Sequence, residues 1–193
     1  AAGAWLKQRG FRFGAAYSSL LLRATRTRSH LLEVLGQPGI ALRSSWRLNE
    51  RHYGALQGMS KEAAVERHGA AQVQAWRRSY HALPPPLAPQ AAPGPQSHGD
   101  EAADHAPASE SLSDLEARVA PMWERELLPA LAQGTELLIV SHGNTLRALR
   151  RLIERRPYDV QAEEEIATGV PILYEVEPSS CLSYRWDLAE ATS

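Results

Sequence analysis

The sequence predicts an α/β fold of three layers, in which a mostly parallel central sheet is covered by helices on both faces. One observation is the order of the chain: short apolar runs alternate with longer segments of helical period, as in parallel strands joined by crossover helices. Another is the run Leu-Leu-Ile-Val at 137–140, which is apolar at every position, as in a strand buried on both faces. The small polar residues 141–145 that follow it are typical of a strand-to-helix turn.

Helix caps, glycine stops and apolar periodicity place the remaining elements. Gly10 and the run Gly-Gln-Pro-Gly at 36–39 should end two helices, while Ser60 and Ser111 are suited to begin two others. Pro121 lies inside a helical pattern and should kink that helix. The expected helices cover 3–9, 21–35, 60–69, a segment around 73–77, 111–131 and 144–155. The expected strands cover 11–18, 40–42, 137–141 and 171–176.

The length and composition predict one domain over residues 1–193, because 193 residues that are 44% hydrophobic can bury a sizeable core. Residues 82–108 lack apolar periodicity and are rich in Pro, Ala and Gly, which predicts a long surface loop or a disordered insert. The chain begins without Met and inside a helical pattern. We therefore expect an N-terminally truncated domain, as in a fragment or a processed chain.

The charge and cysteine content exclude several classes of protein. A formal net charge of −1 argues against a nucleic-acid binder or a membrane-surface protein, because both need a large positive field. Cys181 is the only cysteine and cannot form an internal disulfide, which favours a reducing, cytoplasmic setting. No apolar run reaches the roughly 18 residues of a membrane helix, and no signal peptide is visible. We expect a cytoplasmic protein that binds neither nucleic acid nor membranes.

His142 is the first candidate for chemistry, within the sequence Ser-His-Gly-Asn-Thr at 141–145. This position puts an imidazole at the carboxyl end of a strand, beside the free N–H groups of a helix start, where phosphate binds readily. A histidine there can donate hydrogen bonds to an anion, carry a positive charge or accept a phosphoryl group. The alternative is a structural imidazole that satisfies the end of the strand.

Glu50 is the second candidate, since it lies between Arg47 and Arg51 in an expected loop. An enzyme that moves a phosphoryl group between hydroxyls needs a carboxylate or an imidazole to take and return the hydroxyl proton. Glu50 suits that role, and the alternative is a surface salt bridge.

Cationic residues outside this loop could bind phosphate. The adjacent Arg77 and Arg78 carry guanidinium forks that suit phosphate and carboxylate oxygens, although most such pairs are solvated. Lys61 is ambiguous taken alone, and Arg23 follows a second expected strand-to-helix junction. No metal site is evident, because the histidines lack the supporting cysteine or carboxylate spacing.

Together these motifs resemble the cofactor-dependent phosphoglycerate mutases of the histidine phosphatase superfamily, including the similar bisphosphoglycerate mutases. The resemblance covers about residues 4–177, with a gap across 88–108. The matching segments are Arg-Leu-Asn-Glu-Arg-His-Tyr-Gly at 47–54, Trp-Arg-Arg-Ser-Tyr at 76–80 with the prolines 84–86, Glu-Ser-Leu at 110–112, Ser-His-Gly-Asn at 141–144 and Thr-Gly-Val-Pro-Ile at 168–172.

The resemblance implies a reaction and a set of roles. Glu50 would be the proton donor and acceptor, and His142 would stabilise the phosphoryl group in flight. The substrate-binding residues would be Arg23, Glu50, Arg51, His52, Tyr53, Lys61, Arg77, Arg78, Gly143 and Asn144. The implied activity is the glycolytic interconversion of 2- and 3-phosphoglycerate through a phosphohistidine, with 2,3-bisphosphoglycerate as primer and no metal. A homodimer is compatible with the resemblance, because homo-oligomers are common among such enzymes.

One departure from the family leaves alternatives open. The family's phosphorylated histidine belongs to an Arg-His-Gly motif on an N-terminal first strand, and this chain has no counterpart there. Arg67-His68-Gly69 matches the letters but ends an expected helix, and His98 lies in the expected loop. We expect this chain as given to be inactive and poorly stable, and the full-length parent to be active. The alternatives are a bisphosphoglycerate mutase or phosphatase, and a phosphate-binding pseudoenzyme without the nucleophile.

Overall fold

Three parallel strands form the central sheet of the computed structural model, which describes residues 1–88, 107–158 and 166–177 and the backbone of 182–187. The strands are β1 (Ala15–Ser18), β2 (Ala41–Ser44) and β3 (Leu137–Val140), in the order β2-β1-β3. Ala15 of β1 lies in register with Ala41 on one side and with Leu137 on the other. All three carboxyl ends therefore meet at one edge of the sheet.

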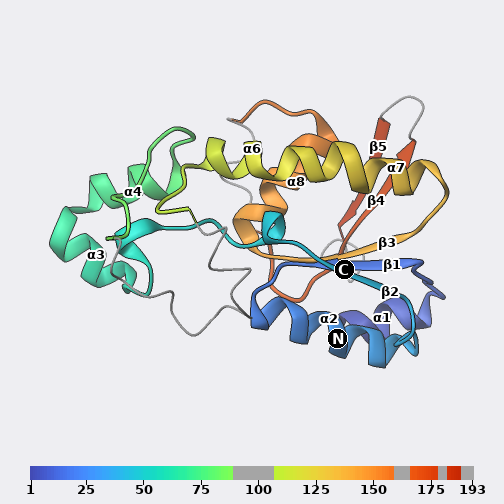
Figure 1. The fold of residues 1–193 in the computed structure, drawn as a ribbon. Coiled ribbons are helices and arrows are strands. Elements are labelled where there is room, and N and C mark those ends of the chain that lie inside the picture. Colours follow the sequence, from blue (N-terminus) through green and yellow to red (C-terminus); the bar gives the residue numbers. More distant parts are fainter. Residues whose placement is uncertain (89–106, 159–165, 178–181, 188–193) are drawn as a thin grey trace.

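Helices cover both faces of this sheet, which confirms the predicted α/β fold of three layers (Figure 1). Helices α1 (Ala2–Gln8) and α2 (Leu22–Leu35) lie on one face, and α6 (Leu112–Met122) and α8 (Gly143–Glu154) lie on the other. Strand β1 divides its side chains between the two resulting cores. Ala15 and Tyr17 pack in the core with α6 and α8, whereas Ala16 packs in the core with α1 and α2. This alternation follows from the two-residue period of a strand.

A third, smaller cluster lies beyond the end of the sheet, where α3 (Lys61–His68) and α4 (Ala70–Arg78) pack together (Figure 1). Two short 3₁₀ helices, η1 (Trp46–Leu48) and η2 (Gly54–Leu56), lie in the segment that leads to it from β2. Both helices predicted here are confirmed, including the Ser60 cap, whose hydroxyl accepts the N–H of Ala63. The buried side chains of the cluster are Leu56, Ala64, Val73 and Trp76.

The expectation that residues 171–176 extend the parallel order was wrong. Strand β4 (Ile172–Glu177) pairs antiparallel with β5 (Leu182–Asp187), and among the described residues this hairpin is separate from the three-stranded sheet. The β4 residues are partly exposed rather than buried on both faces, which suits an antiparallel pair with one solvated side. Strand β5 was not predicted from the sequence.

A change of helix type follows Pro121, where the sequence predicts a kink. Helix α6 includes Pro121 and ends at Met122, and a single π-helical segment, η3 (Trp123–Leu127), then leads into α7 (Leu128–Ala132). This wider turn buries both Trp123 and Leu127 against the core of α6 and α8. Within the described residues no helix is long and apolar enough to span a membrane.

Residues 82–88 and 107–108, at the two ends of the predicted 82–108 loop, contain no helix or strand, and the loop as a whole stays a prediction. Residues 89–106 lie outside the described part of the chain.

Candidate active site

The imidazole of His142 is held at the junction of β3 and α8, where His142 is the N-cap residue. Its Nδ1 accepts a hydrogen bond from Nε of Arg23 at 3.1 Å, and its Nε2 lies 2.7 Å from Oγ of Ser19. Because a guanidinium can only donate, Nδ1 carries no proton, and the neutral ring keeps its proton on Nε2. The ring is therefore fixed as a hydrogen-bond donor through Nε2.

Burial keeps this ring neutral. Desolvation, followed by the positive charges of Arg23 and Arg118, lowers the pKa of His142 to about 4. The first N–H groups of a helix have no partner within the helix, so the start of α8 at Gly143 and Asn144 adds backbone donors beside the imidazole. A neutral donor next to a helix N-terminus suits the oxygens of a phosphoryl group.

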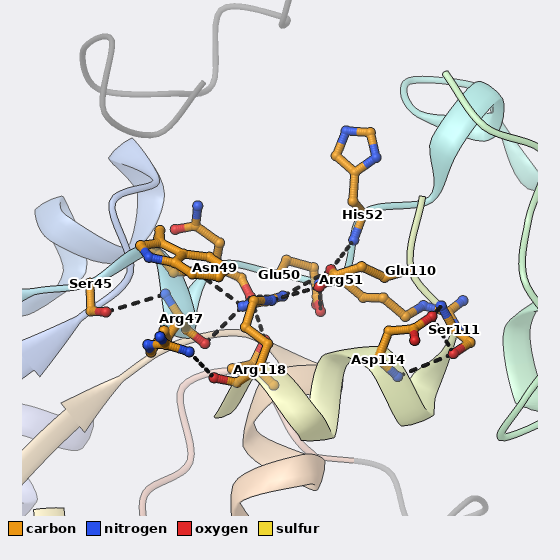
Figure 2. Close-up of polar contacts among 12 residues, drawn as sticks. Ser45, Arg47, Asn49, Glu50, Arg51, His52, Glu110, Ser111, Asp114 and Arg118 are labelled. Carbon is orange, nitrogen blue, oxygen red and sulfur yellow. Dashed lines mark hydrogen bonds and ion pairs between the residues drawn. The ribbon is translucent and has the colours of Figure 1, made fainter. Parts of the chain in front are cut away.

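Glu50 lies near this junction because the residue before it is hydrogen-bonded to the segments that follow β1 and β3. Oδ1 of Asn49 accepts the N–H of Leu20, two residues after the end of β1, at 2.9 Å. The carbonyl of Asn49 accepts the hydroxyl of Thr145 at 2.7 Å, in the first turn of α8. The half-buried carboxylate of Glu50 accepts the N–H of Arg51 at 2.8 Å (Figure 2). The strand ends and this loop thus form one site.

Arg51 and Tyr53 connect this loop to α4 and α8. Arg51 is only 1% exposed, donates through Nη2 to the carbonyl of Trp76 at 2.8 Å, and lies 4.2 Å from the ring centre of Tyr53. The hydroxyl of Tyr53 accepts Nδ2 of Asn144 at 3.1 Å. Nε and Nη1 of Arg51 are buried and have no partner among the described residues. Two orphaned donors on a buried cation suit an anionic ligand.

Further arginines line a pocket that lies next to Tyr53, since Arg77 and Asn144 of its lining both contact Tyr53. Its lining includes Arg77, Arg78 and Asn144. Arg147 also lines it, with Nη1 3.4 Å from Oδ1 of Asn144. The sequence reasoning missed Arg147, although its place one helical turn after Asn144 was a usable signal. It also missed Ser19, whose role depends on a contact across more than a hundred residues.

Two predicted site residues are less closely joined to this group. The ring of His52 points away from Glu50 and Glu110 in Figure 2, and its Nδ1 accepts the N–H of Gly54 at 3.2 Å. Burial lowers the pKa of His52. Lys61 is exposed in the first turn of α3, and within the described residues no hydrogen bond or ion pair joins it to another predicted site residue.

Gly54 explains why the prolines near residue 85 lie beside this loop. Its φ of +58° is in the left-handed region, and a Cβ there would lie 2.0 Å from the carbonyl oxygen of Pro85. The next N–H, that of Ala55, donates to the same oxygen at 2.8 Å. Glycine at 54 therefore permits a close backbone crossing that fixes one end of the 82–108 loop beside the site.

The Arg-His-Gly sequence at 67–69 is the end of a helix, as predicted. His68 is the last residue of α3, its ring lies 5.1 Å from that of Trp76, and Gly69 has a φ of +81°. His98 lies outside the described residues. The described ranges contain no group of three or more metal-binding side chains.

Comparisons with known proteins identify the family and agree with the fold. The sequence model of the histidine phosphatase superfamily (branch 1) matches residues 1–92 and 88–169. A 2,3-bisphosphoglycerate-dependent phosphoglycerate mutase from Hamiltonella defensa subsp. Acyrthosiphon pisum (strain 5AT) is 40% identical over 181 residues, which are 92% of this chain and 73% of the relative.

Solved structures share the fold at lower identity. The alpha-ribazole phosphatase from Shigella flexneri matches with a TM-score of 0.67 and 16% identity, over 97% of this chain and 79% of the other. A mycobacterial glucosyl-3-phosphoglycerate phosphatase in complex with VO3 matches with a TM-score of 0.66 and 21% identity, over 96% and 81%. The family match and the 40% identical relative show that this chain belongs to the histidine phosphatase superfamily (branch 1).

Proposed function

We propose that this protein is a phosphoglycerate mutase, which interconverts 2- and 3-phosphoglycerate through a phosphohistidine in cytoplasmic glycolysis. One observation carries the proposal: the loop with Glu50 is hydrogen-bonded through Asn49 to the segments that follow β1 and β3, and the neutral imidazole of His142 lies at the same junction, bonded to Arg23. The 40% identical mutase supports the same reaction.

The donor set suits a small, highly charged phosphate ester. Guanidinium groups of Arg23, Arg51, Arg77 and Arg78 outnumber the one carboxylate of the loop, and Arg51 holds two buried donors without a described partner. Such forks match phosphate and carboxylate oxygens. The same donors fit 2,3-bisphosphoglycerate, which when bound supplies the phosphoryl group that primes the family's histidine.

Each side chain has a definite part in the transfer. Glu50 takes the proton from the glycerate hydroxyl that gains the phosphoryl group, and returns a proton to the oxygen that loses it. Nε2–H of His142, which here donates to Ser19, is the donor for the oxygens of the transferring group. The arginines offset the negative charge of those oxygens.

A second candidate is a phosphoglycerate-binding protein without turnover. The observation that favours it is the position of Arg67-His68-Gly69 at a helix end: within the described residues no Arg-His-Gly follows a strand. Such a protein would bind the same anions through the same arginines and would leave them unchanged.

The full-length parent, in which turnover is expected, should be incubated with 3-phosphoglycerate and 2,3-bisphosphoglycerate, with products followed by ³¹P NMR and binding by calorimetry. A mutase forms 2-phosphoglycerate, whereas release of inorganic phosphate would indicate a phosphatase. Glu50→Gln should lower kcat by at least about 100-fold, and the exposed carboxylate variant Glu33→Gln should leave it unchanged. Binding without turnover supports the second candidate, and no binding of either compound contradicts both.

A further inference from the structure

A buried ion pair between Glu110, just before α6, and Arg118 of α6 holds the loop that carries Glu50. Arg118 and Glu110 are 7% and 3% exposed, and the guanidinium meets the carboxylate through two bonds, Nε to Oε1 at 2.6 Å and Nη2 to Oε2 at 2.9 Å. Neither residue contributes to the pocket or contacts His142 directly, and neither was singled out for a role from the sequence.

The Arg118 side of the pair anchors the loop before Glu50. Its Nη1 donates to the carbonyls of Trp46 at 3.1 Å and Arg47 at 2.7 Å, and its Nη2 donates to the carbonyl of Asn49 at 3.1 Å (Figure 2). In return, Nη1 of Arg47 donates to the carbonyl of Arg118 at 3.1 Å. All five N–H groups of the guanidinium can be satisfied in this way.

The Glu110 side anchors the loop after Glu50. Its Oε2 accepts the N–H of His52 at 2.9 Å, and its own N–H donates to the carbonyl of His52, also at 2.9 Å. Glu50 and Arg51 are therefore the two residues between the anchors at Asn49 and His52 (Figure 2). Their backbone cannot shift unless one of these bonds breaks.

The chemistry of the pair requires a guanidinium. A lysine keeps the charge but offers three donors from one nitrogen, so it cannot bridge the carboxylate and three carbonyls in this plane. The unpaired carbonyls and carboxylate would then be buried without partners, which favours movement of the loop toward water.

We propose that Arg118 and Glu110 are positioning residues, which set the place of the Glu50 carboxylate relative to His142 by fixing the backbone on both sides of it. The catalytic part of this inference rests on the proposed function, whereas the positioning itself can be measured without turnover. Errors of about 1 Å in such a group can cost on the order of 100-fold in rate.

Amide hydrogen exchange in the whole chain tests the positioning directly. Arg118→Lys should speed exchange at Arg51 and His52 by at least about tenfold. The matched control is Arg150→Lys, because Arg150 is also buried in an ion pair, with Glu154 in α8, and bonds to Tyr174 of β4. The control should change exchange at Arg51 and His52 by less than about twofold. Equal acceleration in both variants, or none in Arg118→Lys, would overturn the proposal.

Glu110→Gln is the second variant, in case Arg118→Lys does not fold. It keeps the shape and one acceptor oxygen but removes the charge that pairs with Arg118, and it should accelerate exchange at the same two amides. Unchanged exchange there would count against the proposal.

Mutase kinetics of the full-length parent, in which turnover is expected, provide the functional measurement. Arg118→Lys should lower kcat by about 100-fold and change KM by less than about threefold, because the arginines that hold the substrate are untouched. A general loss of structure would instead lower the active fraction of both Arg118→Lys and Arg150→Lys. A full-length wild-type parent without turnover would contradict the proposed function, and the exchange measurement would still decide the positioning.

Discussion

At the scale of single residues, the protonation of His142 follows from its two hydrogen-bond partners. Arg23 can only donate, so it makes Nδ1 an acceptor and leaves the proton on Nε2. Burial disfavours a second proton on the ring, and a proton on Nδ1 would also meet the positive charge of the Arg23 guanidinium. The sequence showed where the imidazole would lie, but it could not show Ser19 as a partner, because that contact joins the ends of two strands far apart in the chain.

The pKa of His142 gives a prediction about pH and stability. Its folded value of about 4 lies below the usual 6.5, so the unfolded chain binds this proton first as the pH falls. The contribution of His142 to the free energy of unfolding is therefore complete above pH 6.5 and is lost as the pH falls through about 4. Arg23→Gln should raise the pKa of His142 but keep it below 6.5, because burial is the larger cause.

NMR titration of the imidazole measures this shift, with Arg26→Gln as the matched control on an exposed part of the same helix. Titration of wild-type His142 near 6.5, or an identical pKa in the Arg23→Gln protein, would contradict the prediction.

At the scale of elements, the start of α6 fixes the position of Glu110. Ser111 and Asp114 form a reciprocal capping box: Oγ of Ser111 accepts the N–H of Asp114 at 3.1 Å, and the Asp114 carboxylate accepts the N–H of Ser111 at 2.9 Å. The hydroxyl of Ser111 also donates to the carboxylate at 2.6 Å. These hydrogen bonds lower the pKa of Asp114. Because Glu110 directly precedes the N-cap Ser111, the capping box also fixes the backbone of the residue that anchors the Glu50 loop.

Ser111→Ala should lower the free energy of unfolding by about 1–2 kcal/mol, at the upper end for an N-cap, because Ser111 is buried and bonded in both directions. Ser60→Ala removes the equivalent bond to Ala63 at an exposed cap without the reciprocal bond, and should cost less. Urea denaturation of both variants measures the difference. Equal losses, or a larger loss in Ser60→Ala, would contradict the expected role of the capping box.

The elements differ in how well the sequence predicted them. Helix caps and apolar periodicity depend on residues a few positions apart, so α2, α3, α4 and α8 were predicted near their observed bounds. The single helix predicted over 111–131 begins as expected but is divided into α6, η3 and α7. Pairing of β4 with β5 depends on partners chosen in three dimensions, which a short apolar run does not specify. The same limit applies to the site. Glu50 and His142 could be recognised from the residues around them in the sequence, whereas Arg118 bonds to the Glu50 loop at residues at least 69 positions away.

At the scale of the whole molecule, strand β1 cannot leave one core without leaving the other, because Ala15 and Tyr17 face α6 and α8 while Ala16 faces α1 and α2. The cluster of α3 and α4 has its own buried side chains beyond the sheet. We therefore expect the three layers to unfold together, and the α3–α4 cluster to be able to open separately.

Leu127→Ala tests this coupling, because Leu127 is fully buried in the core of α6 and α8. It should lower the free energy of exchange of the most protected amides by about 3 kcal/mol, both in α8 and in α2 on the opposite face of the sheet. Val73→Ala, in the α3–α4 cluster, should lower protection in α3 and α4 and leave α2 unchanged. Native-state hydrogen exchange measures all four helices in one experiment. Unchanged protection of α2 in the Leu127→Ala protein would show that the two faces of the sheet open independently. If they open together through the shared strand β1, the most protected amides of α2 and α8 must lose the same free energy of exchange.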